Sequence, residues 1–182
     1  MFSVLLLWLS ADHLFRCIYR ILHILTSEQV YRNFVRLPTR DAPVPSKIQR
    51  SSKFSQYFRG CLGALDGTHI PAHVPEERRT AYRNRKSYLS QNVLAACDFD
   101  LKFIYVLSGW EGSAADSRVL EDAKSKADFV IPEGRYYLGD AGYPNSASLL
   151  VPYRNTRYHL KEWGKGNQRC ASAHSFIQFA CS

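Results

Sequence analysis

The sequence contains no CxxC pair, no glycine-rich phosphate loop and no GxSxG nucleophile motif. These absences argue against a cysteine-ligated zinc site, a P-loop and a hydrolase-type serine nucleophile. The five cysteines are scattered singly, which is typical of free or buried thiols in a reducing compartment rather than of a disulfide framework. The remaining candidates for chemistry are the carboxylates, the histidines and the basic side chains.

Long apolar runs are also missing. The one near the N-terminus, in MFSVLLLWLS, is far too short to span a bilayer. No Lys or Arg precedes it and Asp12 follows closely, which disfavours a signal peptide. Apolar residues instead recur at near-helical spacing from Val4 to Leu25, which predicts an amphipathic helix. We therefore expect no membrane role.

Acidic residues are scarce relative to basic ones. The chain has 24 Lys and Arg against 16 Asp and Glu, a formal net charge of +8. This balance favours a polyanionic partner such as nucleic acid, although many basic proteins bind none.

Two segments gather the basic side chains. The first, EERRTAYRNRKSY (76–88), interleaves them with two tyrosines, and the second is PYRNTRYHLKEW (152–163). Such segments can pair with phosphates and lay aromatic rings against bases or sugars; a solvated loop with offsetting glutamates is the competing interpretation. The candidate nucleic-acid contacts are Arg83, Arg85, Lys86, Arg154 and Arg157.

The hydrophobic pattern predicts a mixed α/β sheet with helices packed on it. A proline-rich connector, LPTRDAPVPSK, separates the N-terminal helices from the strands, and a turn at 98–100 favours an antiparallel hairpin. The expected elements are helices at 4–25 and 28–35, strands at 61–70, 92–99 and 102–110, a helix at 112–127 and a strand at 135–138.

Two aspartates follow apolar strands in similar settings. Asp66 comes after LGAL and Asp140 after YYLG, and a glycine trails each within two positions. A buried carboxylate needs a partner, a metal ion or water, because an unpaired buried charge is costly. If the two strands are neighbours, both carboxylates converge at one edge of the sheet, where Mg²⁺ would find oxygen ligands. The competing interpretation is that each aspartate starts a turn or caps a helix.

The other polar candidates have simpler explanations. Ser113 and Asp116 fit an S-x-x-D capping box, which accounts for Asp116 without a metal ion. His69 and His73 lack a matching Cys or Glu cluster, so ordinary surface or core histidines are expected.

Four long phrases of the sequence carry a resemblance to a known family. They run in order from about residue 54 to residue 163: YFRGCLGALDGTHIPAHVP, YRNRKSYLSQNVLAACDFDLKFIYVLSGWEGSAADSRVL, YYLGDAGYP and LLVPYRNTRYHLKEW. Together they resemble the Harbinger-type transposases and transposase-derived nucleases, whose catalytic domain is a DDE-superfamily endonuclease with an RNase H-like fold.

The resemblance implies that Asp66 and Asp140 are the first two catalytic members of a carboxylate triad that binds Mg²⁺ or Mn²⁺ for DNA cleavage. Asp116 matches another acidic position of the family and is implied as a further metal ligand. The segment at Arg85 and Lys86 would approach DNA, and the expected location is nuclear.

The chain also departs from the family. The family's third carboxylate, a Glu on a later helix, has no counterpart, because Glu162 is the last acidic residue. We expect an N-terminal helical remnant and connector (1–50), a partial RNase H-like DDE nuclease domain (54–163), incomplete at its C-terminus, and a divergent tail (164–182). The shortened N-terminal helical region predicts a separate DNA-binding partner protein.

Two functions therefore stay open. One is a metal-dependent DNA endonuclease impaired by loss of the third carboxylate. The other is a non-catalytic DNA- or protein-binding remnant of the same fold.

Overall fold

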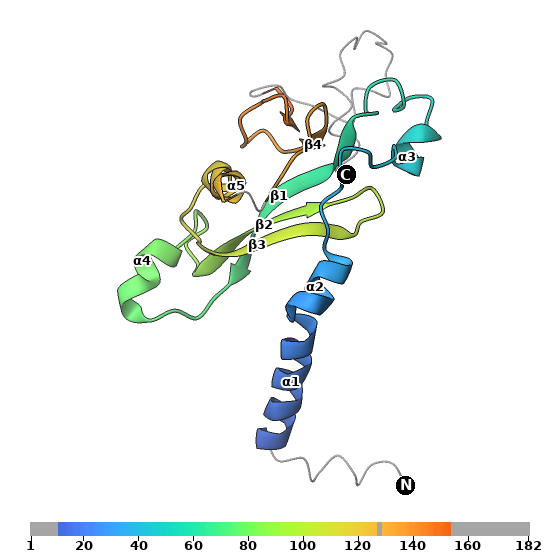
Figure 1. The fold of residues 1–182 in the computed structure, drawn as a ribbon. Coiled ribbons are helices and arrows are strands. Elements are labelled where there is room, and N and C mark those ends of the chain that lie inside the picture. Colours follow the sequence, from blue (N-terminus) through green and yellow to red (C-terminus); the bar gives the residue numbers. More distant parts are fainter. Residues whose placement is uncertain (1–10, 127–128, 154–182) are drawn as a thin grey trace, which may run out of the picture. The chain divides into compact units, whose positions relative to one another are not determined.

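The computed structural model describes residues 11–126 and 129–153, in two units that divide after Arg36. The first unit contains helices α1 (Ala11–Leu25) and α2 (Glu28–Phe34) (Figure 1). Both predicted N-terminal helices are confirmed, and the predicted start of the first at Val4 lies outside the described residues. No helix in the described ranges combines the length and apolarity needed to cross a membrane.

The apolar side chains of α1 remain largely uncovered. The helix is amphipathic. The acidic Asp12 lies in its first turn and the basic His23 in its last turn, the arrangement that the helix dipole favours. The large apolar side chains that stay exposed on α1 are Leu14, Phe15, Ile18, Tyr19, Ile21, Leu22, Ile24 and Leu25.

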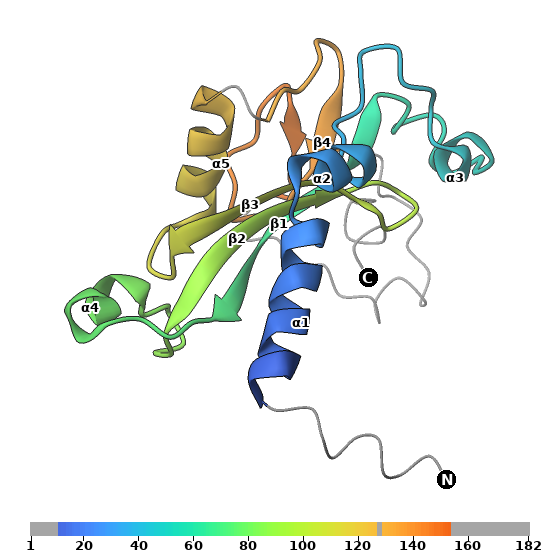
Figure 2. The ribbon, with the colours of Figure 1, turned by 60° about the horizontal axis from the view of Figure 1, so that its bottom comes forward.

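The second unit is built on a mixed five-stranded sheet with the order β3-β2-β1-β4-β5 (Figures 1 and 2). The β1–β2 and β2–β3 pairs are antiparallel, whereas β1–β4 and β4–β5 are parallel. This arrangement agrees with the RNase H-like α/β fold expected from the sequence. The strands are β1 (Cys61–Pro71), β2 (Ser90–Cys97), β3 (Phe103–Glu111), β4 (Tyr136–Leu138) and β5 (Leu149–Leu150).

The hairpin expected between the second and third strands is confirmed, and Asp98 stabilises its turn. Its Oδ1 accepts hydrogen bonds from the backbone N–H groups of Asp100 and Lys102, at 2.8 and 2.9 Å. Leu101 adopts a positive φ of 62°, which the tight reversal of the chain requires.

Helix α5 (Asp116–Ser125) lies against one face of the sheet (Figure 2). Its predicted apolar stripe is confirmed, since Val119, Leu120 and Ala123 are all buried. The predicted capping box is wrong. The N-cap residue is Ala115, and no side chain makes a cap hydrogen bond, so the helix begins four residues later than the sequence predicted.

Two apolar clusters pack against the sheet, one on each face. Successive strand residues point to opposite faces, and on β4 Tyr137 joins the α5 cluster while Leu138 joins the other. In the α5 cluster the ring of Phe129 packs between Tyr105 and Tyr137, with centroids 4.7 and 5.3 Å away. The second cluster packs Ile48 of α3 (Ser46–Gln49) and Phe58 against Leu138.

The connection from β1 to β2 contains two short helical elements that the sequence did not predict. A 3₁₀ turn, η2 (Glu76–Arg78), leads directly into α4 (Arg79–Tyr82). Together they place the basic segment beyond one end of the sheet.

Candidate functional site

The parallel pairing of β1 with β4 gives Asp66 and Asp140 equivalent positions. Ala64 and Leu138 are partners in the β1–β4 ladder, and each aspartate follows its partner residue by two positions. Asp66 is still within β1, whereas Asp140 lies just past the end of β4, and both are exposed. The two carboxylates therefore lie at the same level of neighbouring parallel strands, beside the end of β4 and midway along β1.

Each of these carboxylates is oriented by a backbone amide supplied by a following glycine. Oδ1 of Asp66 accepts a hydrogen bond from the N–H of Gly67 at 2.8 Å, and Oδ1 of Asp140 accepts one from Gly142 at 2.9 Å. The Asp140 contact is a local turn interaction of the kind that aspartates commonly make. In both residues Oδ2 makes no hydrogen bond within the described parts of the chain, so it remains available to a ligand.

Asp116, the first residue of α5, lies against the same stretch of β1. Its Oδ1 accepts a hydrogen bond of 2.7 Å from Nδ2 of Asn92, a fully buried residue of β2. The same Nδ2 donates to the carbonyl of Ala114 at 3.0 Å. A Cβ atom added to Gly67 would come within 2.2 Å of Oδ1 of Asp116, so only a glycine allows the helix end to approach this closely.

We refer to Asp66, Asp116 and Asp140 as the aspartate cluster. Burial raises the pKa of the Asp66 carboxyl above its ordinary value, and the charges of Asp140 and Asp116 raise it further. The hydrogen bond from Gly67 opposes this shift. Across residues 11–126 and 129–153, no Lys, Arg or His forms an ion pair with any of the three. The cluster is thus a concentration of negative charge without a counter-ion among the described residues.

The chemistry of these donors fits a hard divalent cation, which prefers carboxylate oxygens and completes its coordination with water. Such a cation fits the pair Asp66 and Asp140, because Oδ2 of each makes no hydrogen bond within the described residues. Within the described ranges no three His, Cys, Asp or Glu residues are grouped closely enough to hold a metal ion. Asp116, whose Oδ1 is occupied by Asn92, lies beside the pair rather than completing a three-residue set.

A second polar group surrounds His69, and it explains that histidine without a catalytic role. Nδ1 of His69 lies 3.1 Å from Oγ of Ser90, and that oxygen also accepts a hydrogen bond of 3.0 Å from Nδ2 of Asn84. Ser90 and Asn84 are buried. This network joins the start of β2 to the end of β1 and supports the expectation of an ordinary histidine.

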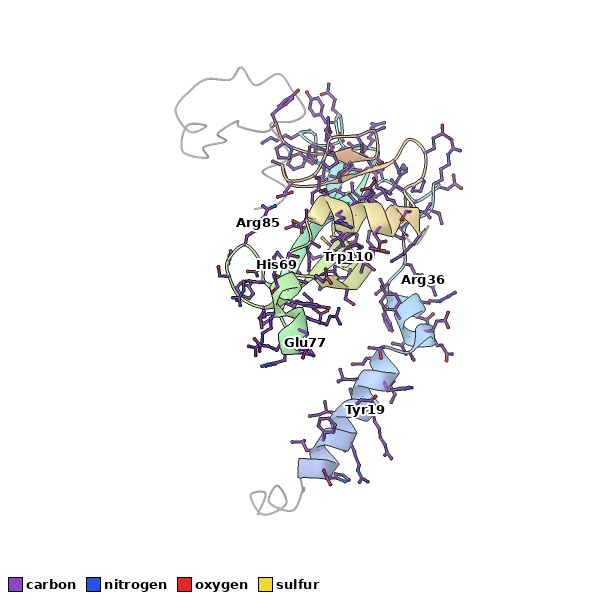
Figure 3. The ribbon with its side chains drawn as sticks, turned by 90° about the vertical axis from the view of Figure 1, so that its left-hand side faces the viewer. Tyr19, Arg36, His69, Glu77, Arg85 and Trp110 are labelled. Carbon is purple, nitrogen blue, oxygen red and sulfur yellow. The ribbon has the colours of Figure 1, made fainter. Side chains whose placement is uncertain are left out.

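Residues 83–88 of the basic segment form a loop, exposed except at Asn84, which we call the basic loop. Nη1 of Arg83 donates to the carbonyl of Ser87 at 2.8 Å, and Ser87 adopts a φ of 65°. Arg85 and Lys86 are exposed, and Figure 3 shows Arg85 at the outer edge of the loop. Arg154 and Arg157, also predicted as nucleic-acid contacts, lie outside the described residues.

The tyrosines of this segment are not equivalent. Tyr82 is buried, and its hydroxyl accepts a hydrogen bond of 3.1 Å from Arg78, whose guanidinium lies 5.1 Å from the ring centroid. Tyr88 is 39% exposed. Stacking against a base, which the sequence suggested for both rings, is therefore open to Tyr88 alone.

Tyr143 and Asn92 are site residues that the sequence did not reveal. Both are fully buried, and the hydroxyl of Tyr143 and Oδ1 of Asn92 have no hydrogen-bond partner within the described residues. Burial and the charges of Asp116, Asp66 and Asp140 all raise the pKa of Tyr143. The available signal for Asn92 was its place as the first residue of the predicted apolar strand 92–99, since a buried amide needs a specific partner.

Comparison with known proteins places this chain in a family. A family model described as DDE superfamily endonuclease matches residues 65–179, a range that extends into the tail that we expected to diverge. No solved structure matches the chain.

Several curated proteins are similar to the chain. "Putative nuclease HARBI1" of Rattus norvegicus is 26% identical over 175 residues, covering 93% of this chain and 48% of the relative. "Protein ALP1-like" of Arabidopsis thaliana is 30% identical over 158 residues, covering 76% of this chain and 39% of the relative. The chain thus spans about half or less of the length of these relatives. Because the family model covers more than half of the chain, the chain belongs to the DDE superfamily endonucleases, which confirms its resemblance to the Harbinger-type transposase-derived nucleases.

Proposed function

We propose that this chain carries the carboxylate centre of a metal-dependent DNA endonuclease, with Asp66 and Asp140 as its catalytic, metal-binding residues. The observation that carries the proposal is the β1–β4 register, which gives the two aspartates equivalent positions on neighbouring parallel strands. The absence of a protein counter-ion in the described ranges supports it, because a carboxylate among like charges favours a bound cation.

The chain's own residues would hold and orient this centre. The N–H groups of Gly67 and Gly142 each fix one oxygen of a carboxylate and leave the other for a cation. Asp116 adds a third negative charge beside Asp66 and is proposed as an auxiliary metal ligand. A bound Mg²⁺ or Mn²⁺ would supply an activated water and stabilise the leaving oxygen of the phosphodiester.

The basic loop is the proposed DNA contact. From Asp66 to Pro71, β1 runs for five residues, or ~17 Å of extended chain, towards the η2–α4 connection. Arg83, Arg85 and Lys86 would bind phosphates beyond the carboxylates, with Arg154 and Arg157 as further contacts. A nuclear location and a separate DNA-binding partner protein complete the proposal.

We further propose that the site lacks the family's third carboxylate and that cleavage by this chain is correspondingly slow. Loss of one electrostatic catalytic group costs on the order of 10²–10³-fold in turnover in other enzymes. The second candidate function is a non-catalytic DNA- or protein-binding module. This second function is favoured because the described parts of the chain contain no group of three residues that could hold a metal ion.

Cleavage of supercoiled plasmid in Mn²⁺ tests the first function. The chain should nick the plasmid, and the double variant Asp66→Asn, Asp140→Asn should not. Asp41→Asn is the matched control, because Asp41 is an exposed aspartate whose neighbour Ala42 accepts a hydrogen bond from Arg135 at the opposite end of β4. Equal nicking by wild type and the double variant would identify a contaminant and reject the nuclease. Salt-sensitive DNA binding without nicking would establish the binding module instead.

A further inference from the structure

Asn84 is buried at the base of the basic loop, whereas the rest of the loop is exposed. Its side-chain oxygen, Oδ1, accepts hydrogen bonds from the backbone N–H groups of Lys86 and Tyr88, at 2.9 and 3.3 Å. Its backbone closes the same turn, because its carbonyl accepts from the N–H of Ser87 at 2.9 Å and its N–H donates to the carbonyl of Tyr88 at 3.0 Å. One buried asparagine thus holds the loop together from its interior.

The two basic residues that follow Asn84 have their backbone fixed by these bonds. Arg85 and Lys86 are the central residues of the turn that the bond between Ser87 and Asn84 closes. Ser87 completes the turn with a φ of 65°, a conformation that a residue other than glycine adopts uncommonly. The bond from Arg83 to the carbonyl of Ser87 holds the turn from its other side. The loop therefore presents two adjacent cations on an ordered backbone.

The side chain of Asn84 also anchors the loop to the sheet. Its Nδ2 donates to Oγ of Ser90 at 3.0 Å, and Ser90 is the fully buried first residue of β2. The same oxygen lies 3.1 Å from Nδ1 of His69 on β1. A loop that is hydrogen-bonded both internally and to a buried residue of a sheet has little conformational freedom left to lose when it binds a ligand.

We propose that Asn84 is a positioning residue that preorganises the basic loop, so that Arg85 and Lys86 meet the phosphates of DNA without first having to be ordered. Asn84 touches no DNA itself, because it is buried; it acts through the turn that it closes and through Ser90. The inference rests on the proposed function for the DNA contact, whereas the order of the loop does not depend on that function.

The first experiment measures binding of a duplex oligonucleotide across a salt series by fluorescence anisotropy. Asn84→Ala should weaken binding about tenfold, because two long side chains and their backbone are then ordered only on binding. The slope of log K against log salt should keep the wild-type value, because the same phosphates are contacted. The double variant Arg85→Ala, Lys86→Ala should lower that slope instead. Ser90→Ala removes only the anchor and should weaken binding by a smaller factor than Asn84→Ala.

The second experiment measures amide hydrogen exchange by NMR without DNA, and so reports on the loop directly. The N–H groups of Lys86 and Tyr88 should be protected in the wild type, and Asn84→Ala should accelerate their exchange. Asn84→Asp should restore the protection, since a carboxylate can accept the same two hydrogen bonds. Ile48→Val is the matched control for a general loss of stability, because Ile48 is buried in the second apolar cluster. It should change neither the exchange of the loop nor the DNA affinity.

Unchanged exchange in Asn84→Ala would overturn the inference, and so would equal effects of Asn84→Ala and Ile48→Val. A fall in the salt slope equal to that of the double variant would overturn it too, because phosphate contacts would then be lost rather than made at a higher cost. Accelerated exchange with unchanged affinity would also overturn it where the double variant weakens binding. If exchange accelerates but neither Asn84→Ala nor the double variant alters DNA binding, the proposed DNA contact fails, and the ordering of the loop by Asn84 stands.

Discussion

Asp66 and Asp140 stand two residues beyond Ala64 and Leu138, which are partners in the parallel β1–β4 ladder. The relationship has an electrostatic consequence, because each carboxylate adds to the field at the other. The raised pKa of Asp66 records this repulsion together with burial. In the metal-free protein the cluster therefore opposes folding at neutral pH, and relief of that repulsion can be measured.

Replacement of Asp66 by Asn should stabilise the metal-free chain at pH 7. A carboxyl whose pKa is higher in the folded state than in the unfolded state favours folding only when protonated. That contribution is fully present below the ordinary value of 3.8 and is lost as the pH rises through the raised folded pKa. The gain from Asp66→Asn should thus be absent near pH 3.5 and present at pH 7. Because Asp66 is exposed, we expect less than about 1 kcal/mol.

Urea unfolding at both pH values checks this prediction, with Asp41→Asn as the control that should show no pH-dependent gain. Addition of Mn²⁺ should reverse the order, so that the wild type becomes the more stable protein. A loss of stability in metal-free Asp66→Asn at pH 7 would contradict the proposed repulsion.

Gly67→Ala should displace Asp116. The new Cβ would lie 2.2 Å from Oδ1 and 2.5 Å from Cγ of Asp116, so the helix end or the carboxylate has to move. The movement breaks the hydrogen bond from Nδ2 of Asn92, which keeps only its bond to the carbonyl of Ala114. We expect a loss of about 1–3 kcal/mol in the free energy of unfolding, typical of overpacking.

Thr68→Ala is the control for this change, because Thr68 is the next residue of β1 and is exposed. Urea unfolding should place it within about 0.5 kcal/mol of the wild type. Equal stability of Gly67→Ala and Thr68→Ala would show that Asp116 does not pack against Gly67.

Most strands were predictable because apolar runs of suitable length mark them. The parallel pairing of β1 with β4 was not predictable in this way. The prediction that the two aspartates converge depended on the condition that their strands are neighbours. The sequence could not establish this condition, because strand order depends on contacts between distant segments. The two-residue β5 is too short to carry a pattern. The first residues of β2, Ser90 and Gln91, are polar and fall outside an apolar run.

Asp116 shows why local rules fail at this site. Ser113 and Asp116 have the spacing of a capping box, but Asn92, which lies 24 residues away in sequence, donates to the carboxylate instead. The backbone N–H of Ser113, which a capping box would direct to Asp116, donates instead to the carbonyl of Ala81 at 3.0 Å. Tyr143 was missed for a related reason, because nothing in GDAGYP distinguishes a buried hydroxyl from an exposed one.

Arg85→Ala combined with Lys86→Ala should reduce the salt dependence of DNA binding. Both side chains are exposed, and neither forms a salt bridge within the described residues. Each phosphate contact contributes about −0.9 to the slope of log K against log salt for duplex DNA. The double variant should therefore lower the slope by up to about 2 units, measured by fluorescence anisotropy across a salt series.

Arg79→Ala supplies the control for that measurement. Arg79 belongs to the same segment, but its guanidinium is paired with Glu76 at 2.6 Å, so its charge is already partly neutralised. Its loss should change the slope less than the loss of either free side chain. If Arg79→Ala had the larger effect, the DNA contact would lie on α4 rather than on the basic loop.

The cysteines of β1 and β2 should react in an order set by their burial. Cys61 is fully buried in the second apolar cluster, so alkylation requires unfolding. Cys97 is partly exposed, but burial and the charge of Asp98 raise the pKa of its thiol and reduce the reactive thiolate. Pulse alkylation with peptide mass spectrometry should label Cys97 slowly at pH 7.5 and much faster at pH 9, with Cys61 protected at both.

Asp98→Asn tests the cause of this difference. The amide oxygen of Asn can still accept the two turn hydrogen bonds that Oδ1 of Asp98 receives, so the hairpin should be preserved. Removal of the negative charge should speed the labelling of Cys97 at pH 7.5 and leave Cys61 protected. Native-state labelling of Cys61 as fast as that of Cys97 would contradict the packing of β1 against Phe58 and Leu138, and with it the sheet that positions Asp66.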